Sequence, residues 1–153
     1  MFHRIAPLAV IAFAGAAWAG NHGRDLRPAQ LLSYTQECSS CHVAYPPGLL
    51  PSASWQRLMG NLSRHYGTDA SLDPASLKEL TSWLVANAGS YRRVAEAPPE
   101  DRITRSAWFF RKHDEVPART WKLPAVKRPS NCVACHARAD QGDFDEHNVR
   151  IPR

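Results

Sequence analysis

Apolar residues recur at helical spacing in the first half of the chain, most clearly between Ser52 and Gly67. Ser52 can cap a helix that begins there, and Gly67 offers a stop signal near its end. The predicted helix ends at His65, and its apolar face carries Trp55, Leu58, Met59 and Leu62. A histidine at the end of such a stripe is expected to point towards whatever the helix covers.

Two more helices are predicted further along the chain. Residues 74–88 follow Asp73 as N-cap, with Pro74 at the first helical position. Residues 104–115 form a second helical pattern, ended by Pro117 and with His113 near its end. The buried face of the first of these helices is expected to carry Leu77, Leu80, Leu84 and Ala88.

Shorter helices are predicted at both pairs of cysteines. Residues 28–37 lead into the first pair, and Ser130 could cap a helical turn at the second. No stretch alternates apolar and polar residues for long enough to form a sheet. The pattern therefore predicts a mostly α protein with short helices joined by proline-rich loops.

The N-terminus has the layout of a secretory signal peptide. A basic start is followed by an apolar run over residues 5–17 and by the small-x-small sequence of residues 17–19. The run is shorter than the roughly 20 residues of a spanning helix, which disfavours the alternative of an uncleaved membrane anchor. Cleavage after Ala19 would leave 134 of the 153 residues, with no further transmembrane segment.

All four cysteines fall into two copies of one motif, C-x-x-C-H. The copies are formed by Cys38, Cys41 and His42, and by Cys132, Cys135 and His136. Two thiols at this spacing can form thioethers to the two vinyl groups of one haem, with the adjacent histidine as the proximal iron ligand. The motifs therefore predict two covalently attached haem c groups, which would supply much of the core of this small chain.

Two other uses of the cysteines compete with haem attachment. Two disulfides would each close a very small loop, would add little stability and would leave both histidines unexplained. A four-cysteine zinc site usually brings its two C-x-x-C pairs closer together in the sequence. Haem attachment explains every residue of both motifs.

Each iron then needs a sixth ligand. His65 and His113 are the favoured distal ligands, because each lies on a predicted helix among apolar or aromatic side chains. Met59 is the strongest competitor, but a methionine within an apolar stripe is more often part of the core. His22 and His147 are alternatives that are better explained as surface residues.

The predicted order of ligands is mirrored between the two sites. His65 follows His42 by 23 residues, whereas His113 precedes His136 by 23 residues. This order argues against a tandem repeat of one cytochrome domain. We assign His65 to the first haem and His113 to the second, and a crossed arrangement would give the same pattern. Residues 97–100 are the best boundary, dividing the chain into a first haem c unit over residues 20–96 and a second over residues 97–153.

Charge is unevenly distributed along the chain. The formal net charge is +5, and residues 92–129 hold ten basic and five acidic residues. This segment could steer an acidic redox partner, or it could simply be a solvated surface. The basic residues are not dense enough to indicate binding to nucleic acid.

The sequence resembles the small bacterial dihaem cytochromes c, the DHC family. Besides the two haem motifs, the likeness rests on residues 45–51, Trp55, Met59, residues 65–67, Ala70, Leu72, residues 83–84, residues 102–104, residues 108–109, His113, Asn131 and residues 151–153. The resemblance implies a small cytochrome c-like fold packed around two low-spin haems. It implies bis-histidine ligation by His42, His65, His113 and His136.

The resemblance also implies a function. Members of this family are periplasmic electron carriers that exchange electrons with small monohaem cytochromes c or with b-type membrane cytochromes. We therefore expect a soluble electron-transfer carrier rather than an enzyme. The alternatives are a small dihaem electron-transfer subunit of a reductase complex, or a haem enzyme or ligand binder with one open iron site.

Overall fold

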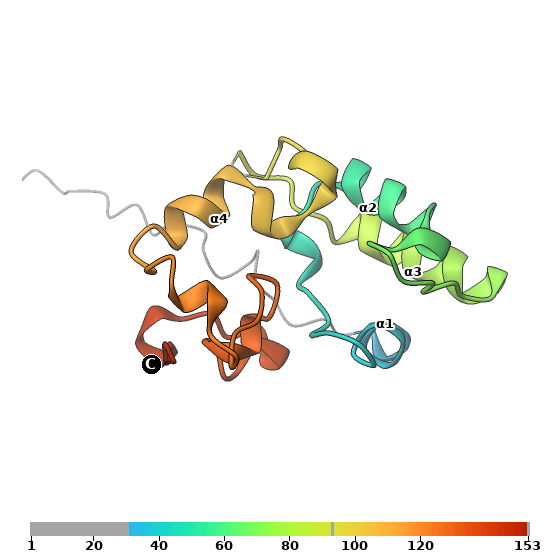
Figure 1. The fold of residues 1–153 in the computed structure, drawn as a ribbon. Helices are drawn as coiled ribbons and strands as arrows, with labels where there is room; N and C mark the ends of the chain where they lie inside the picture. The colour runs from blue at the N-terminus through green and yellow to red at the C-terminus, as the bar shows by residue number, and fades with distance from the viewer. Residues whose placement is uncertain (1–30, 93, 153) are drawn as a thin grey trace, which may run out of the picture.

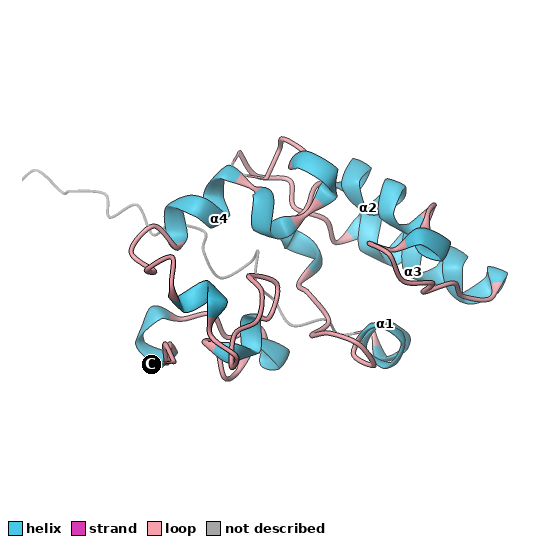
Figure 2. Ribbon diagram, in the orientation of Figure 1, coloured by secondary structure: helices cyan, strands magenta, loops and turns pink. Residues whose placement is uncertain are grey.

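The structure, a computed structural model, describes residues 31–92 and 94–152. Its α-helices are α1 (Leu32–Cys38), α2 (Ser52–Met59), α3 (Pro74–Ala86) and α4 (Ala107–Lys112) (Figure 1). Loops and short 3-10 turns connect these helices, and the described part of the chain forms no strand (Figure 2). The prediction of a mostly α protein with short helices is confirmed.

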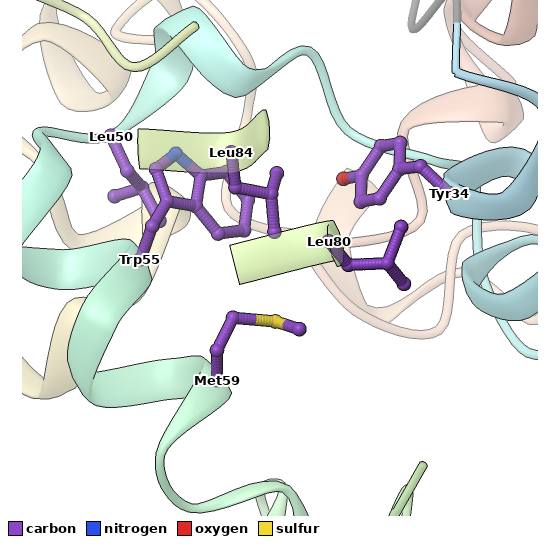
Figure 3. Close-up of a cluster of buried hydrophobic side chains, with 6 residues drawn as sticks. All are labelled: Tyr34, Leu50, Trp55, Met59, Leu80 and Leu84. Carbon is purple, nitrogen blue, oxygen red and sulfur yellow. The ribbon is translucent and has the colours of Figure 1, made fainter. Parts of the chain in front are cut away.

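The hydrophobic core lies where α1, α2 and α3 meet. α2 packs along α3, and α1 also contacts α3. Six buried side chains form the centre of this core (Figure 3): Tyr34, Leu50, Trp55, Met59, Leu80 and Leu84. All six belong to the first haem c unit predicted over residues 20–96, so this apolar cluster does not extend into the second cysteine motif.

The start of α3 agrees with its prediction. The carboxylate of Asp73 accepts hydrogen bonds from the backbone amides of Ala75 and Ser76, at 2.9 and 3.1 Å, and Pro74 occupies the first turn. Hydrogen bonding to Ser76, first from its side chain and then from its backbone amide, holds the pKa of Asp73 below its ordinary value. The helix ends at Ala86, two residues earlier than predicted.

The helix predicted to run from Ser52 to His65 is shorter in the structure. It ends at Met59, and no side chain caps its start, so the capping role predicted for Ser52 is wrong. Gly60 follows directly, and glycine is among the weakest helix formers. A 3-10 turn (Leu62–Arg64) then carries the chain to His65, which therefore lies beyond the helix.

Gly67 belongs to a tight turn and does not end a helix. Its φ is +95°, and the preceding Tyr66 has a φ of +50°. Two consecutive residues with positive φ reverse the chain, and glycine takes such a conformation at little cost. The backbone amide of Thr68 donates to the carbonyl of His65 at 3.0 Å and closes the turn. This turn fixes the backbone directly after His65.

α4 is also shorter than the predicted helix over residues 104–115. The hydroxyl of Ser106 accepts a hydrogen bond from the amide of Phe109 at 3.2 Å and caps the helix at its start. The helix ends at Lys112, well before Pro117, and His113 is the residue that follows it. The histidine is thus placed at a helix end, where its backbone is no longer helical.

The two cysteine motifs differ in local structure. The first motif begins at Cys38, the last residue of α1. This helix was predicted over residues 28–37 and begins at Leu32 in the structure, while residues 28–30 lie outside the described part. The second forms a 3-10 turn (Cys132–Ala134), and the side chain of Ser130 does not cap it. The predicted cap at Ser130 is therefore wrong.

The predicted boundaries of the chain are only partly covered by the structure. The predicted signal peptide, residues 1–19, lies outside the described residues. Among the residues that are described, no helix is long and apolar enough to cross a membrane. Directly after the predicted boundary at residues 97–100, Asp101 accepts two hydrogen bonds from Arg57 of α2, at 2.6 and 2.9 Å.

Candidate haem sites

The first candidate site lies between His42 and His65. Their ring centres are 6.2 Å apart and their planes are inclined by 26°. The backbone amide of His42 donates to the carbonyl of Cys38 at 3.4 Å, so the motif folds back as one turn at the end of α1. The structure thus brings together the histidine of the first motif and the distal histidine predicted for it.

The second candidate site lies between His113 and His136. Their ring centres are 6.1 Å apart, and their planes are inclined by 77°. The backbone amide of His136 donates to the carbonyl of Cys132 at 2.8 Å, which closes the same kind of turn as in the first motif. The rings of both predicted histidine pairs therefore lie close together, and neither pairing is crossed.

The separation of the rings fits a single metal ion between each pair. A metal–imidazole bond is about 2.0–2.1 Å long, and the ring centre lies roughly 1 Å behind the ligating nitrogen, so two axial imidazoles have centres about 6 Å apart. Both measured separations agree with this value. The donor sets therefore fit a six-coordinate haem iron at each site.

Backbone carbonyls orient two of the four imidazoles. Nδ1 of His42 lies 2.7 Å from the carbonyl oxygen of Val43, and Nδ1 of His113 lies 2.9 Å from that of Phe109. Because a carbonyl can only accept, these nitrogens carry the proton, and Nε2 is left free to ligate a metal. Nδ1 of His136 is buried and has no hydrogen-bond partner among the described residues.

Burial also favours the protonation state that binds metal. It is the largest cause of the lowered pKa of both His65 and His136, and in each case the facing histidine lowers the pKa further. An imidazole must be neutral to ligate a metal ion. Both rings are therefore kept in the form that iron requires.

The cysteines have no features of a thiol-redox or zinc site. All four lie in the described part of the chain, and none forms a disulfide. Burial raises the pKa of Cys38 and that of Cys132 to about 11, whereas reactive thiols have lowered pKa values. Among the described residues, no three histidine, cysteine or acidic side chains converge as a metal site would require.

The competing ligands lie elsewhere. Met59 is 7% exposed and belongs to the hydrophobic core, where Figure 3 shows its side chain among those of α2 and α3. The side chain of His147 is 84% exposed, and its Nδ1 lies 2.7 Å from a carboxylate oxygen of Asp145. His22 lies outside the described residues.

Aromatic side chains surround the four histidines, and most were not singled out from the sequence. Tyr45 stacks on His42, with ring centres 4.8 Å apart, and the ring centre of Phe144 lies 5.2 Å from that of His136. Trp121 lies 5.8 Å from His113 by the same measure. Phe144 and Trp121 each lie eight residues from the histidine that they contact, and Tyr45 lies three residues after His42.

Comparisons with known proteins agree with this geometry. The model of the dihaem cytochrome c family matches residues 34–144. The diheme cytochrome c of Shewanella baltica OS155 is 42% identical, with a TM-score of 0.70 over 79% of this chain and 92% of that one. The DHC of Rhodobacter sphaeroides is 43% identical, with a TM-score of 0.67 over 76% of this chain and 99% of that one. No curated protein matches. The chain therefore belongs to the dihaem cytochrome c family, carries two haem c groups and has a haem-based electron-transfer role.

Proposed function

We propose that the protein is a periplasmic electron carrier with two bis-histidine haem irons. His42 and His65 ligate the first iron, and His113 and His136 ligate the second. The proposal rests on the close approach of the imidazoles in each pair, whose ring centres are 6.2 Å apart at the first site and 6.1 Å apart at the second. With two protein ligands on each iron, no position is left for a substrate, which favours a carrier over an enzyme.

The residues of the chain hold the cofactors and set their surroundings. When bound, each haem iron takes up and releases one electron. Cys38 and Cys41 form the thioethers of the first haem, and Cys132 and Cys135 those of the second. The signal-peptide pattern of residues 1–19 supports the periplasmic location.

The ligand assignment predicts two distinguishable low-spin ferric signals from the purified holoprotein. The histidine planes are inclined by 26° at the first site and by 77° at the second, so the two irons experience different axial fields. Electron paramagnetic resonance of the oxidised protein measures both signals. A substantial high-spin ferric population would contradict the assignment and favour an open iron site.

The surface around α4 supports an acidic redox partner. The segment over residues 107–128 holds two acidic residues, Asp114 and Glu115, against six exposed basic residues that form no ion pair within the described part of the chain: Arg111, Lys112, Arg119, Lys122, Lys127 and Arg128. Phe110, in the middle of α4, is 61% exposed. An exposed aromatic ring among unpaired cations suits an acidic protein surface.

We propose that this partner is a small monohaem cytochrome c or a b-type membrane cytochrome. Lys112 directly precedes His113, so an acidic partner bound at this surface would lie beside the second haem site. Small redox reagents can test the charge of this surface without knowledge of the partner. The anionic hexacyanoferrate(III) and the cationic hexaammineruthenium(III) serve as the probes.

Lys112→Glu is expected to slow oxidation of the reduced holoprotein by hexacyanoferrate(III) about twofold to fivefold at low ionic strength. The reaction with hexaammineruthenium(III) should become faster. Lys78→Glu is the matched control, because Lys78 is exposed on α3, which lies at the other end of the molecule from α4 (Figure 1). Equal effects of the two variants on stopped-flow rates would argue against a local docking surface.

A further inference from the structure

Tyr45 connects the two haem sites. Its ring stacks on that of His42, with centres 4.8 Å apart and planes inclined by 20°. Its hydroxyl donates a hydrogen bond to the backbone carbonyl of Ser130 at 2.7 Å, across 85 residues of sequence. The same carbonyl oxygen lies 3.7 Å from Sγ of Cys132. One side chain thus contacts the ligand of the first site and the attachment segment of the second.

The backbone of Tyr45 is itself fixed to the hydrophobic core. Its carbonyl accepts a hydrogen bond from the hydroxyl of Tyr34 at 2.8 Å. Tyr34 is 2% exposed, and its ring packs against that of Trp83 at a centre-to-centre distance of 5.0 Å. The core therefore holds Tyr45 at its carbonyl, and the side chain reaches from this fixed point towards both sites.

Tyr66 provides a close comparison within the same molecule. It is adjacent to His65, with ring centres 4.9 Å apart, and its hydroxyl also donates to a backbone carbonyl, that of Glu100, at 2.9 Å. However, its plane is tilted by 58° from the histidine, and it is 42% exposed. Its hydrogen-bond partner, Glu100, belongs to a turn that contacts α2 and not to a cysteine motif.

We propose that Tyr45 is a positioning residue that sets the plane of the His42 ring and fixes the first haem site to the attachment segment of the second. The stacked ring restricts rotation of the imidazole, and the hydroxyl restrains residues 130–132. The proposal rests on the proposed haem ligation by His42. It assigns Tyr45 no part in binding or releasing electrons.

The first test compares the holoproteins of Tyr45→Phe and Tyr66→Phe. Each substitution removes one hydroxyl that donates to a backbone carbonyl and keeps the aromatic ring. We expect Tyr45→Phe to speed amide hydrogen exchange over residues 130–136 about threefold to tenfold, because one restraining hydrogen bond is lost. Tyr66→Phe should leave exchange in this segment unchanged. No change with Tyr45→Phe, or an equal change with both variants, would overturn the proposal.

The second test concerns the stacked ring. Tyr45→Leu is expected to alter the g anisotropy of one low-spin signal while both irons stay low-spin. The wild-type holoprotein should also show nuclear Overhauser contacts from the Tyr45 ring to His42 and to residues 130–132. Absence of those contacts would overturn the proposal without any variant. A high-spin signal in the wild type would instead contradict the ligand assignment, so the two failures are distinguishable.

Discussion

Replacement of His65 by alanine is expected to convert one of the two haems from low spin to high spin. The imidazole of His65 faces that of His42 across 6.2 Å, and no other described histidine faces His42. Loss of an imidazole ligand destabilises the ferric state more than the ferrous state. The midpoint potential of that haem should therefore rise by on the order of 100 mV. Spectroscopy of the ferric protein and a potentiometric titration measure the two effects.

Met59→Leu is the matched control for this experiment. Met59 lies on α2, six residues before His65, and is buried in the hydrophobic core. Leucine has a similar volume, so the change should cost less than about 1.5 kcal/mol of stability and leave both spin states unaltered. If His65→Ala left both midpoints unchanged, the assignment of His65 would be wrong. A high-spin signal in Met59→Leu would point to a methionine ligand.

The double substitution Cys132→Ala and Cys135→Ala is expected to leave one covalent haem and a loosened second half of the chain. The main apolar cluster comes entirely from residues 34–84. The second predicted unit, described over residues 97–152, contributes only a few buried apolar side chains: Phe109, Val126 and Ala139. Without the second haem, this unit would have too little apolar surface to bury. Intact mass should fall by one haem, and proteolysis should become faster over residues 107–152.

The corresponding change at the first motif, Cys38→Ala with Cys41→Ala, is the control. It should also lower the mass by one haem. The cluster around Leu80 and Leu84 remains, so the first half should resist proteolysis better than the second half does in the other variant. A wild-type mass equal to that of the polypeptide alone would contradict covalent attachment at both motifs.

The sequence predicted the features that depend on short spacings. The two C-x-x-C-H motifs, the N-cap at Asp73 and the helical class all follow from residues within one or two turns of each other. The pairing of His65 with the first haem was preferred, but the residue pattern alone does not distinguish it from a crossed arrangement. In contrast, the predicted helices were too long at both distal histidines.

The errors at the helix ends have different causes. The apolar stripe before His65 continues across Gly60, so the pattern favoured one helix although glycine weakens it at that point. The helix before His113 was predicted to begin at residue 104, but the hydroxyl of Ser106 caps it and the helix begins at Ala107. The contact between Tyr45 and Ser130 joins residues 85 positions apart, and only the packed structure reveals it.

The short distance along the chain between the facing histidines has a consequence for folding. At each candidate site the two histidines are separated by 23 residues, so each site closes a short loop at a modest entropic cost. The Tyr45–Ser130 contact closes a much longer loop of 85 residues. Contacts of low sequence separation form faster, so each ligand pair should assemble within its own segment before the two halves dock. The link between the two sites would then be made last.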